Sequence, residues 1–308
     1  MLHPDELARR ARQRVVELAA RKAVHLGAAL SMTDLLAVLY TRGLRYRPDR
    51  PDWPDRDLLV LSKGHGAYGL YAVLAELGVI EADLATLPGH PSDSVPGVEA
   101  ATGALGHGLS IGCGMALGAR LAGRDQRVVV VTGDGELDEG SNWEAAQFAA
   151  HHRLGNLVAV VDRNRLQQEG DTETVNALEP LADKWRAFGW RVAEADGHDT
   201  AAITDALAGL RSGDGPAVLI AHTVKGKGVP FAEGDPAWHM GSLDAQQLRT
   251  ALAALGEPAA LGEPAALGEP AALGEPAALG EPAVPGEPAV PGTPAVPALA
   301  AAARGGRP

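Results

Sequence analysis

Two residues far apart along the chain have side chains that could together bind a divalent cation. Asp134 lies within the tripeptide Gly133-Asp134-Gly135, and 28 residues separate Gly135 from Asn164. One carboxylate with neutral oxygen atoms, completed by phosphate and water oxygens, is a usual ligand set for Mg²⁺. Glycines beside the aspartate allow a sharp turn and a close approach to a phosphate. The pattern predicts a cation and diphosphate site; the alternative is a Gly-Asp-Gly turn with a purely structural role.

Both residues follow segments that are typical of buried strands. Val128–Thr132 precedes the Gly-Asp-Gly tripeptide, and Leu157–Asp162 comes shortly before Asn164. Three further segments of this kind are Leu58–Leu61, Arg191–Ala195 and Ala217–His222. Largely continuous apolar runs, in place of alternating ones, indicate strands of a parallel sheet that is covered on both faces.

Longer segments rich in Ala and Leu alternate with these strands and predict helices. They are Pro4–Val24, Met32–Tyr40, Ala67–Leu77, Gly108–Leu121, Gly140–His151, Leu178–Phe188, Thr200–Leu210 and Asp244–Leu252. The alternation predicts an α/β fold, namely a doubly wound, mostly parallel sheet flanked by helices. Ligands of such folds bind beyond the carboxyl ends of the strands.

Polar residues and glycines follow four of the five expected strands. The four segments are Ser62–Gly66, Gly133–Glu136, Asp162–Arg165 and Thr223–Gly228. Because the carboxyl ends of parallel strands meet at one edge of a sheet, we expect these segments to line a single polar crevice.

The last part of the chain has a different composition. From Ala253 the hexamer Ala-Ala-Leu-Gly-Glu-Pro repeats five times and then decays. Proline at every sixth residue interrupts helices, and the segment is too poor in large apolar residues to build a core. We expect residues 253–308 to form a disordered tail and residues 1–252 to form one domain.

Charge and cysteine content exclude several classes of protein. The formal net charge is −12 and no cluster of Lys and Arg stands out, so nucleic acid is not an expected partner. Cys113 is the single cysteine, which excludes an internal disulfide framework and favours the reducing cytoplasm. Apolar runs such as Val128–Val131 are far shorter than the ~20 residues of a membrane-spanning helix, so no membrane association is expected.

Several further motifs, taken in order, resemble the amino-terminal half of a transketolase. They are Ser62-Lys63-Gly64-His65, Gly89-His90-Pro91, the segment Thr102–Ser110, the Gly-Asp-Gly tripeptide with its distant Asn, and Trp238-His239. The chain is similar over residues 5 to 252 to transketolases that are split into two chains. The resemblance implies that residues 1–252 bind thiamine diphosphate together with Mg²⁺ or another divalent cation such as Ca²⁺ or Mn²⁺.

The resemblance also implies a role for each matching residue. Asp134, Asn164 and the backbone carbonyl of Leu166 match the metal ligands. Glu139 matches a carboxylate near the cofactor that is buried between paired active sites. The other implied cofactor contacts are His65, Gly103, Leu105, Gly133, Asp134, Gly135, Glu136, Asn164, Leu166 and His239.

The resemblance assigns the catalytic roles to histidines. The residues that match catalytic positions around the reactive carbon and the sugar hydroxyls are His25, His65, His90 and His239. Proton transfer to and from sugar hydroxyls needs groups that titrate near neutral pH, and histidine is the usual one. We expect ordinary core or surface roles for His3, His151, His152 and His198.

The chain departs from the family pattern at a few positions. Leu26-Gly27-Ala28 follows His25 where Pro-Gly-Gly is usual, and His107 stands where Gln is common. Arg163 and Arg165 flank Asn164 in place of smaller residues. The first two departures fall on the substrate side, so they bear on which sugars are used.

Too little chain follows Ala217–His222 for the second domain, whose Glu activates the aminopyrimidine ring of the cofactor. The resemblance therefore implies a partner, a separately encoded carboxyl-terminal transketolase subunit with the pyrimidine-binding domain. We expect a 2+2 heterotetramer in the cytoplasm that acts on sugar phosphates and is inactive without the partner.

The implied function is transfer of a two-carbon ketol unit from a ketose phosphate to an aldose phosphate. One alternative is a subunit similar to 1-deoxyxylulose-5-phosphate synthase or to the alpha chain of a 2-oxo-acid dehydrogenase. Another is a non-catalytic regulatory subunit that retains the fold. The motifs around His65 and His90 favour transketolase over the first, and the intact Asp134 and Asn164 argue against the second.

Overall fold

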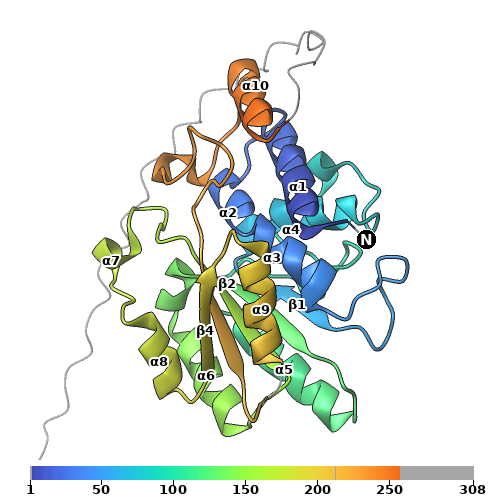
Figure 1. The fold of residues 1–308 in the computed structure, drawn as a ribbon, viewed down its shortest axis with the longest axis vertical. Helices are drawn as coiled ribbons and strands as arrows, with labels where there is room; N and C mark the ends of the chain where they lie inside the picture. Colours follow the sequence, from blue (N-terminus) through green and yellow to red (C-terminus); the bar gives the residue numbers. More distant parts are fainter. Residues whose placement is uncertain (1, 212, 257–308) are drawn as a thin grey trace, which may run out of the picture. The chain divides into compact units, whose positions relative to one another are not determined.

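A parallel sheet forms the centre of the computed structural model, which describes residues 2–211 and 213–256 (Figure 1). Within these residues the strands are β1 (Leu58–Leu61), β2 (Val128–Gly133), β3 (Leu157–Arg163), β4 (Arg191–Asp196) and β5 (Ala217–His222). Their order in the sheet is β1-β2-β3-β5-β4, and every neighbouring pair is parallel. All residues of β2 and β3 are buried, which explains their continuous apolar sequences.

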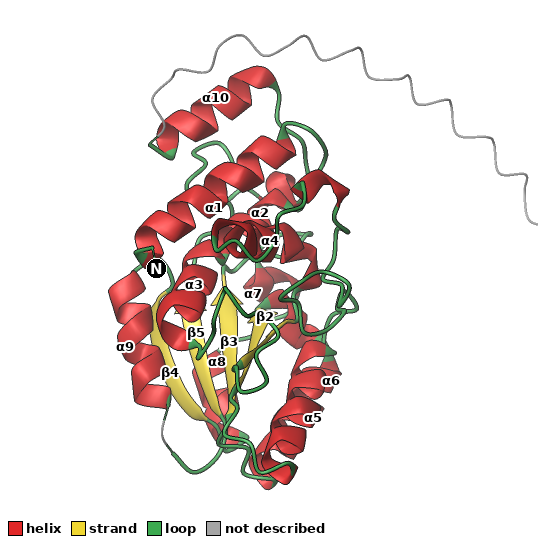
Figure 2. Ribbon diagram, turned by 90° about the vertical axis from the view of Figure 1, so that its right-hand side faces the viewer, coloured by secondary structure: helices red, strands yellow, loops and turns green. Residues whose placement is uncertain are grey.

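Helices cover both faces of this sheet (Figure 2). The core on one face includes residues of α1 (Pro4–Ala19), α2 (Leu26–Ser31), α3 (Thr33–Val38), α4 (Ala67–Glu76) and α9 (Thr200–Leu210), of which α9 contacts β4 and β5 and α1 packs on α3 and α4. The other face packs against α5 (Gly108–Leu121), α6 (Gly140–His151) and α8 (Leu181–Ala187). Alternate strand residues enter the two cores, as Val129 and Val130 do. The prediction of a doubly wound α/β fold is confirmed.

Most expected elements agree with the structure, and the differences have local causes. The first helix ends at Ala19, before Val24, because Val24 pairs in an antiparallel bridge with Gly241. The helix expected over Met32–Tyr40 is preceded by α2, is interrupted at Met32 and continues as a π-helical turn, Leu39–Gly43. Helix α8 begins only after Pro180, since proline lacks the N–H that a helix interior needs.

Shorter elements complete the described part of the chain. They are the 3₁₀ turns Gly64–Gly66, Leu84–Thr86, Gly135–Asp138 and Pro236–His239 and the helices α7 (Thr172–Val175) and α10 (Ala245–Ala254). Asp244 begins α10 with a capping box, in which its side chain accepts from the Gln247 N–H and the Gln247 side chain accepts from the Asp244 N–H.

The register of the sheet brings the polar strand ends into line. Gly133 of β2 lies beside Asp162 of β3, and Asp162 lies beside Ala221 of β5. The segment before α5 approaches the same edge, because a Cβ on Gly64 would lie only 2.9 Å from the Gly103 Cα. Glycine at position 64 therefore lets two loops pass within backbone contact at the carboxyl end of β1.

All described residues fall in a compact unit that spans Met1–Ala260. The tail that we expect to be disordered lies, from residue 257 onward, outside the described residues, so that expectation and the boundary at residue 252 stay predictions. Helix α10 continues to Ala254. In the part of the chain that the structure describes, no helix combines the length and apolar character needed to cross a membrane.

Substitution of two glycines on α5 would test how closely this helix packs against the sheet. A Cβ on Gly112 would lie 2.3 Å from Val130 Cγ2, whereas a Cβ on Gly118 would meet nothing within 4 Å. We predict that Gly112→Ala lowers the free energy of unfolding by about 1–3 kcal/mol through overpacking. The matched Gly118→Ala should raise it by about 0.5–1 kcal/mol through helix propensity. Urea denaturation of both variants checks this, and equal effects would contradict the packing.

Candidate active site

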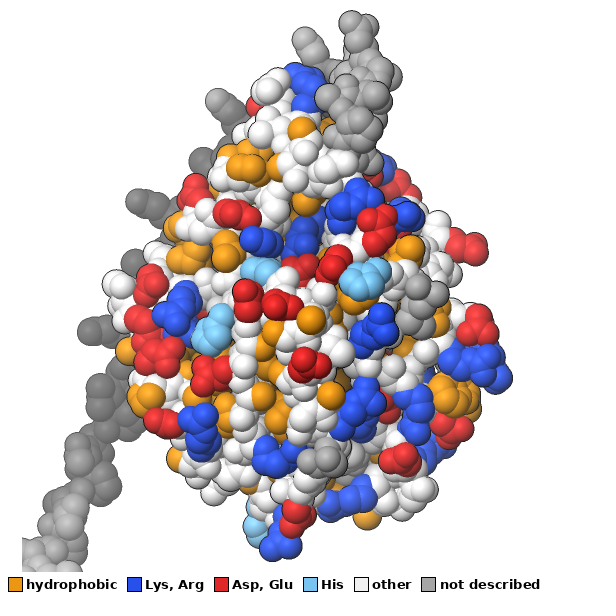
Figure 3. All heavy atoms as spheres, in the orientation of Figure 1, with side chains coloured by type: hydrophobic (Ala, Val, Ile, Leu, Met, Phe, Trp, Pro, Cys, Tyr) orange, Lys and Arg blue, Asp and Glu red, His pale blue; other side chains and the backbone are white. Residues whose placement is uncertain are grey.

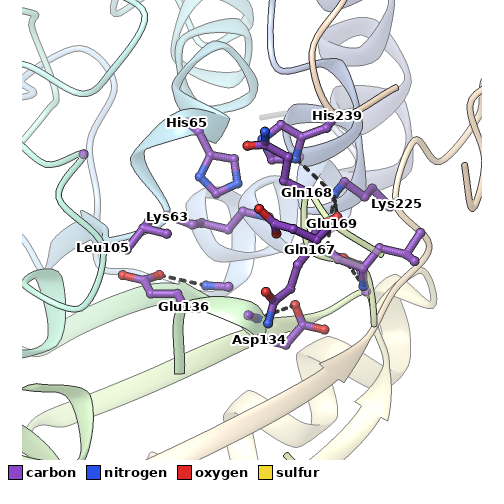
Figure 4. A pocket seen from close by; sticks show the side chains of 16 residues that line it. Lys63, His65, Leu105, Asp134, Glu136, Gln167, Gln168, Glu169, Lys225 and His239 are labelled. Carbon is purple, nitrogen blue, oxygen red and sulfur yellow. Dashed lines mark hydrogen bonds between the residues drawn. The ribbon is translucent and has the colours of Figure 1, made fainter. Parts of the chain in front are cut away.

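The polar ends of β1, β2, β3 and β5 line a pocket of about 330 Å³ (Figure 4). Ten of the residues that the family resemblance assigns to the cofactor line it, namely His65, Gly103, Leu105, Gly133, Asp134, Gly135, Glu136, Asn164, Leu166 and His239. Its volume lies in the range of pockets for small molecules and cofactors. In Figure 4, His65 and His239 lie on the opposite side of the pocket from Asp134.

Asp134 follows β2 and is almost fully buried. Its Oδ1 accepts from the Gly135 N–H at 2.8 Å, and its Oδ2 accepts from the Arg165 N–H at 2.5 Å. The guanidinium of Arg163 lies 3.2 Å from the same Oδ2. Burial and the nearby Asp162 carboxylate raise the pKa of Asp134, which indicates a site where additional positive charge would stabilise the ionised form.

The other two predicted ligands follow β3. Asn164 donates from Nδ2 to Asp162 Oδ2 at 3.3 Å, and its Oδ1 accepts from the Leu166 N–H at 3.1 Å. The carbonyl oxygen of Leu166 accepts from Lys225 Nζ at 3.1 Å. Asp134, Asn164 and Leu166 thus contribute oxygen atoms to the same pocket.

These oxygen atoms fit a cation only in combination with further ligands. Among residues 2–211 and 213–256, no three His, Cys, Asp or Glu side chains are placed to hold a metal ion. Asp134 supplies one carboxylate, Asn164 one amide oxygen and Leu166 one carbonyl oxygen. A Mg²⁺ ion here would take its remaining ligands from phosphate and water oxygens, which matches the preference of that ion.

A buried ion pair that was not predicted from the sequence lies beneath the pocket. Lys63, at the end of β1, contacts Asp162 Oδ2, and both side chains are at most 1% exposed. Ser31 Oγ donates to Asp162 Oδ2 at 2.6 Å, and the Thr223 hydroxyl donates to Oδ1. The signal in the sequence was a charged residue at or within two positions of the end of each buried apolar run, namely Lys63 after Leu61 and Asp162 after Val161.

The four predicted catalytic histidines form one cluster. The ring centroid of His25 lies 5.7 Å from that of His65, 6.1 Å from that of His90 and 5.3 Å from that of His239. Burial, together with nearby cationic groups, lowers the pKa of His65 to about 2 and that of His239 to about 4, and it also lowers the pKa of His25. These three imidazoles are therefore neutral near pH 7 and can accept hydrogen bonds. The low pKa values make His65 and His239 weaker bases than the groups titrating near neutral pH that the sequence led us to expect, because the protein around them disfavours the charged form.

Lys225 is a second residue to which the sequence assigned no role, although it lies in one of the strand-end segments. Its Nζ donates to the carbonyl oxygens of Leu166 and Gln167 and lies 3.2 Å from His239 Nδ1 (Figure 4). Burial lowers the pKa of Lys225 to about 8. An ammonium group thus stands between the oxygen ligands and the histidine cluster.

The two predicted glutamates have different surroundings. The carboxylate of Glu136 accepts from the Gly133 and Gly106 N–H groups at 2.9 Å and from the Ser62 hydroxyl. It therefore cross-links three loops around the pocket. Glu139 is exposed and does not line the pocket, so its expected burial between subunits stays a prediction.

Departures from the family pattern also have defined positions. Ala28 lines the pocket, whereas His107 is exposed and lies outside it. Arg163 is fully buried and also contacts Glu173 and Glu179. On the face shown in Figure 3, acidic and basic side chains are intermixed, with no basic stripe of the kind that nucleic acid requires.

Comparisons of sequence agree with this site. Residues 8–261 match the family model described as transketolase, thiamine diphosphate binding domain. One subunit of the apulose-4-phosphate transketolase of Actinobacillus succinogenes is 43% identical over 265 residues, which cover 82% of this chain and 96% of that protein. The 6-deoxy-6-sulfo-D-fructose transketolase subunit SqwG of Clostridium sp. is 42% identical over 241 residues, or 75% of this chain and 88% of that protein.

Solved structures that resemble this chain are also transketolases. The transketolase of Campylobacter jejuni superimposes with a TM-score of 0.74 at 31% identity, and that of Leishmania mexicana with 0.74 at 29%. The chain spans about 43% of the length of each of these two proteins. Fold, pocket and sequence together show that the chain belongs to the transketolase family and comprises its thiamine diphosphate binding domain.

Proposed function

We propose that the chain is the diphosphate-binding subunit of a two-chain transketolase that transfers a two-carbon ketol unit from a ketose phosphate to an aldose phosphate. The observation that carries the proposal is that one pocket combines the oxygen atoms of Asp134, Asn164 and Leu166 with His65 and His239. Relatives that are similar over most of their length are named as transketolase subunits.

The two sides of the pocket suit the two ends of the cofactor. Thiamine diphosphate, when bound, supplies the carbanion that attacks a ketose carbonyl and then holds the electron pair of the broken bond. Asp134, Asn164 and the Leu166 carbonyl would hold Mg²⁺, or Ca²⁺ or Mn²⁺, beside the diphosphate. Gly135 allows close approach there, and the Lys225 ammonium adds positive charge.

The histidine cluster would transfer protons to and from the hydroxyl groups of the sugar. His65 and His239 are neutral and line the pocket, and the ring of His25 lies next to both of them. His90 is exposed and lies next to the ring of His25. Neutral imidazoles accept hydrogen bonds from sugar hydroxyls. The negative charge of a bound diphosphate and sugar phosphate would raise the pKa of these rings toward the range in which they take up and return a proton as the bond next to the carbonyl breaks and reforms. Four rings within one cluster can also orient several hydroxyls at once.

A partner subunit completes this proposal. The solved transketolases are more than twice as long as the matched region, and the relatives named as individual transketolase subunits imply a second, separate chain. We expect the partner to supply the pyrimidine-binding domain with its activating Glu, in a 2+2 heterotetramer. The exposed positions of Glu139 and of Phe148, which is 40% exposed, leave the α6 surface open for such a contact. The sequence holds a single cysteine, Cys113, and so no internal disulfide, which supports a cytoplasmic location.

The first test concerns the partner. The purified chain with thiamine diphosphate, Mg²⁺ and a ketose phosphate should show no ketol transfer, and an equimolar mixture with the partner subunit should show it. A coupled assay that follows aldose release measures both. Robust turnover by the single chain would contradict the two-chain assignment, and an inactive mixture that still binds cofactor would favour a regulatory subunit.

A second test concerns the cation. In the mixture with the partner, Asp134→Asn should weaken the binding of Mg²⁺ with thiamine diphosphate by at least about 100-fold, since even residues that only orient metal ligands contribute 10–100-fold. Isothermal titration calorimetry measures the affinity. Asp183→Asn, at an exposed carboxylate of α8, is the matched control and should bind as the unmodified protein does. Unchanged affinity in Asp134→Asn would exclude this residue as a ligand.

A third test concerns the histidines. Since the folded chain lowers the pKa of His65 to about 2 and of His239 to about 4, the unfolded chain binds more protons between about pH 6.5 and pH 4. The free energy of unfolding should therefore fall as the pH falls through this window, by at most about 1.4 kcal/mol per pH unit for each proton. Urea titrations at several pH values measure it. His65→Asn should reduce the slope, and the exposed His3→Asn should not.

A further inference from the structure

The ammonium of Lys225 occupies the position of a cation at the predicted ligands. Its Nζ lies 3.1 Å from the Leu166 carbonyl oxygen and 3.0 Å from that of Gln167, and the residue is only 2% exposed. In Figure 4 it reaches these carbonyl groups from the side of His239. A divalent ion bound to the Leu166 oxygen would have to share this atom with a second positive charge, in a pocket where water screens poorly.

Arg163 places a second positive charge at the site. Its guanidinium lies 3.2 Å from Asp134 Oδ2 and is itself fully buried. Of the three predicted ligands, Asp134 and Leu166 thus each contact a cationic side chain, while Asn164 is neutral. The protein satisfies these oxygen atoms with its own cations.

Three carboxylates near the pocket are already paired and do not offset this arrangement. Asp162 is paired with Lys63, and Glu173 and Glu179 are bonded to the far nitrogen of Arg163. Glu136, whose carboxylate accepts three hydrogen bonds, and Glu169 also line the pocket, so Asp134 is the one carboxylate among the predicted ligands but not the sole negative charge near them. A diphosphate changes the balance, because it brings negative charge that attracts the Lys225 ammonium and oxygen atoms that bind the metal.

We propose, on the basis of the function proposed above, that Lys225 couples the binding of the cation to that of the diphosphate. Without a diphosphate, the ammonium holds the carbonyl oxygens of Leu166 and Gln167 and competes with the divalent ion. With a diphosphate, the ammonium pairs with the phosphate oxygens and frees the Leu166 carbonyl for the metal. The Lys225 ammonium thus weakens the binding of the divalent ion and strengthens the binding of the diphosphate. Because the diphosphate draws the ammonium away from the metal ligands, each of the two ligands strengthens the binding of the other.

Mn²⁺ binding to the full chain tests the first half of this proposal. The free ion is measured by electron paramagnetic resonance, without any diphosphate. Lys225→Met should bind Mn²⁺ about tenfold more tightly than the unmodified chain, a change of the size typical of coupling between sites. The matched control is Lys227→Met, which removes a charge from the same loop at a side chain that is 38% exposed. It should bind Mn²⁺ as the unmodified chain does.

The second half is tested in the equimolar mixture with the partner subunit. Thiamine diphosphate should tighten Mn²⁺ binding strongly in the unmodified protein and clearly less in Lys225→Met. Lys225→Gln, which keeps a donor to both carbonyls but no charge, should behave as Lys225→Met does and replaces it if that variant fails to fold.

Two results would overturn the proposal, and they are distinguishable. Equal Mn²⁺ affinity and equal coupling in the unmodified protein and both Lys225 variants would refute the role of Lys225 while leaving the proposed function intact. Absence of Mn²⁺ binding to the unmodified mixture, even with thiamine diphosphate, would refute the proposed cofactor site and the inference with it.

Discussion

The ion pair between Lys63 and Asp162 is the interaction on which the pocket depends. Both side chains are essentially inaccessible to water, and each charge is tolerable there only because the other is present. Asp162 also accepts from Ser31 and Thr223, so one carboxylate connects α2 with the ends of β1, β3 and β5. Breaking such a pair by removing one partner typically costs about 3–5 kcal/mol. The floor of the pocket is therefore fixed by the same contact that holds these elements together.

This carboxylate also determines the chemistry above it. An ionised Asp162 can only accept hydrogen bonds, so the amide group of Asn164 must turn its NH₂ toward it and keep its oxygen on the other side. The backbone N–H groups of Gly135 and Arg165 orient Asp134 in a comparable way. The oxygen atoms that would meet a cation are thus held by the scaffold before any ligand arrives, which lowers the entropic cost of binding.

The sequence was sufficient to predict what depends on short-range patterns. Buried strands are recognisable by continuous apolar runs such as Val128–Val131, and the polar residues after them identified the edge where the pocket lies. Pairings between distant segments were not predictable, because nothing local distinguishes Lys225 from Lys227 or marks the partner of Lys63. His198 shows the same limit: it bonds to Asp34 at 2.7 Å and accepts from the Val224 N–H at 2.8 Å, which only the fold reveals.

The order of the strands has a consequence for how the chain folds during synthesis. Among the described strands, β5 lies between β3 and β4, so β4 emerges from the ribosome before its only neighbour in the sheet exists. The sheet can close only after residue 222 has been made, and the loop that carries Lys225 follows still later. Such non-local pairing is slow and leaves apolar edges exposed meanwhile. The pocket is therefore among the last features to form, and a chain that ends before β5 would have neither a complete sheet nor a binding site.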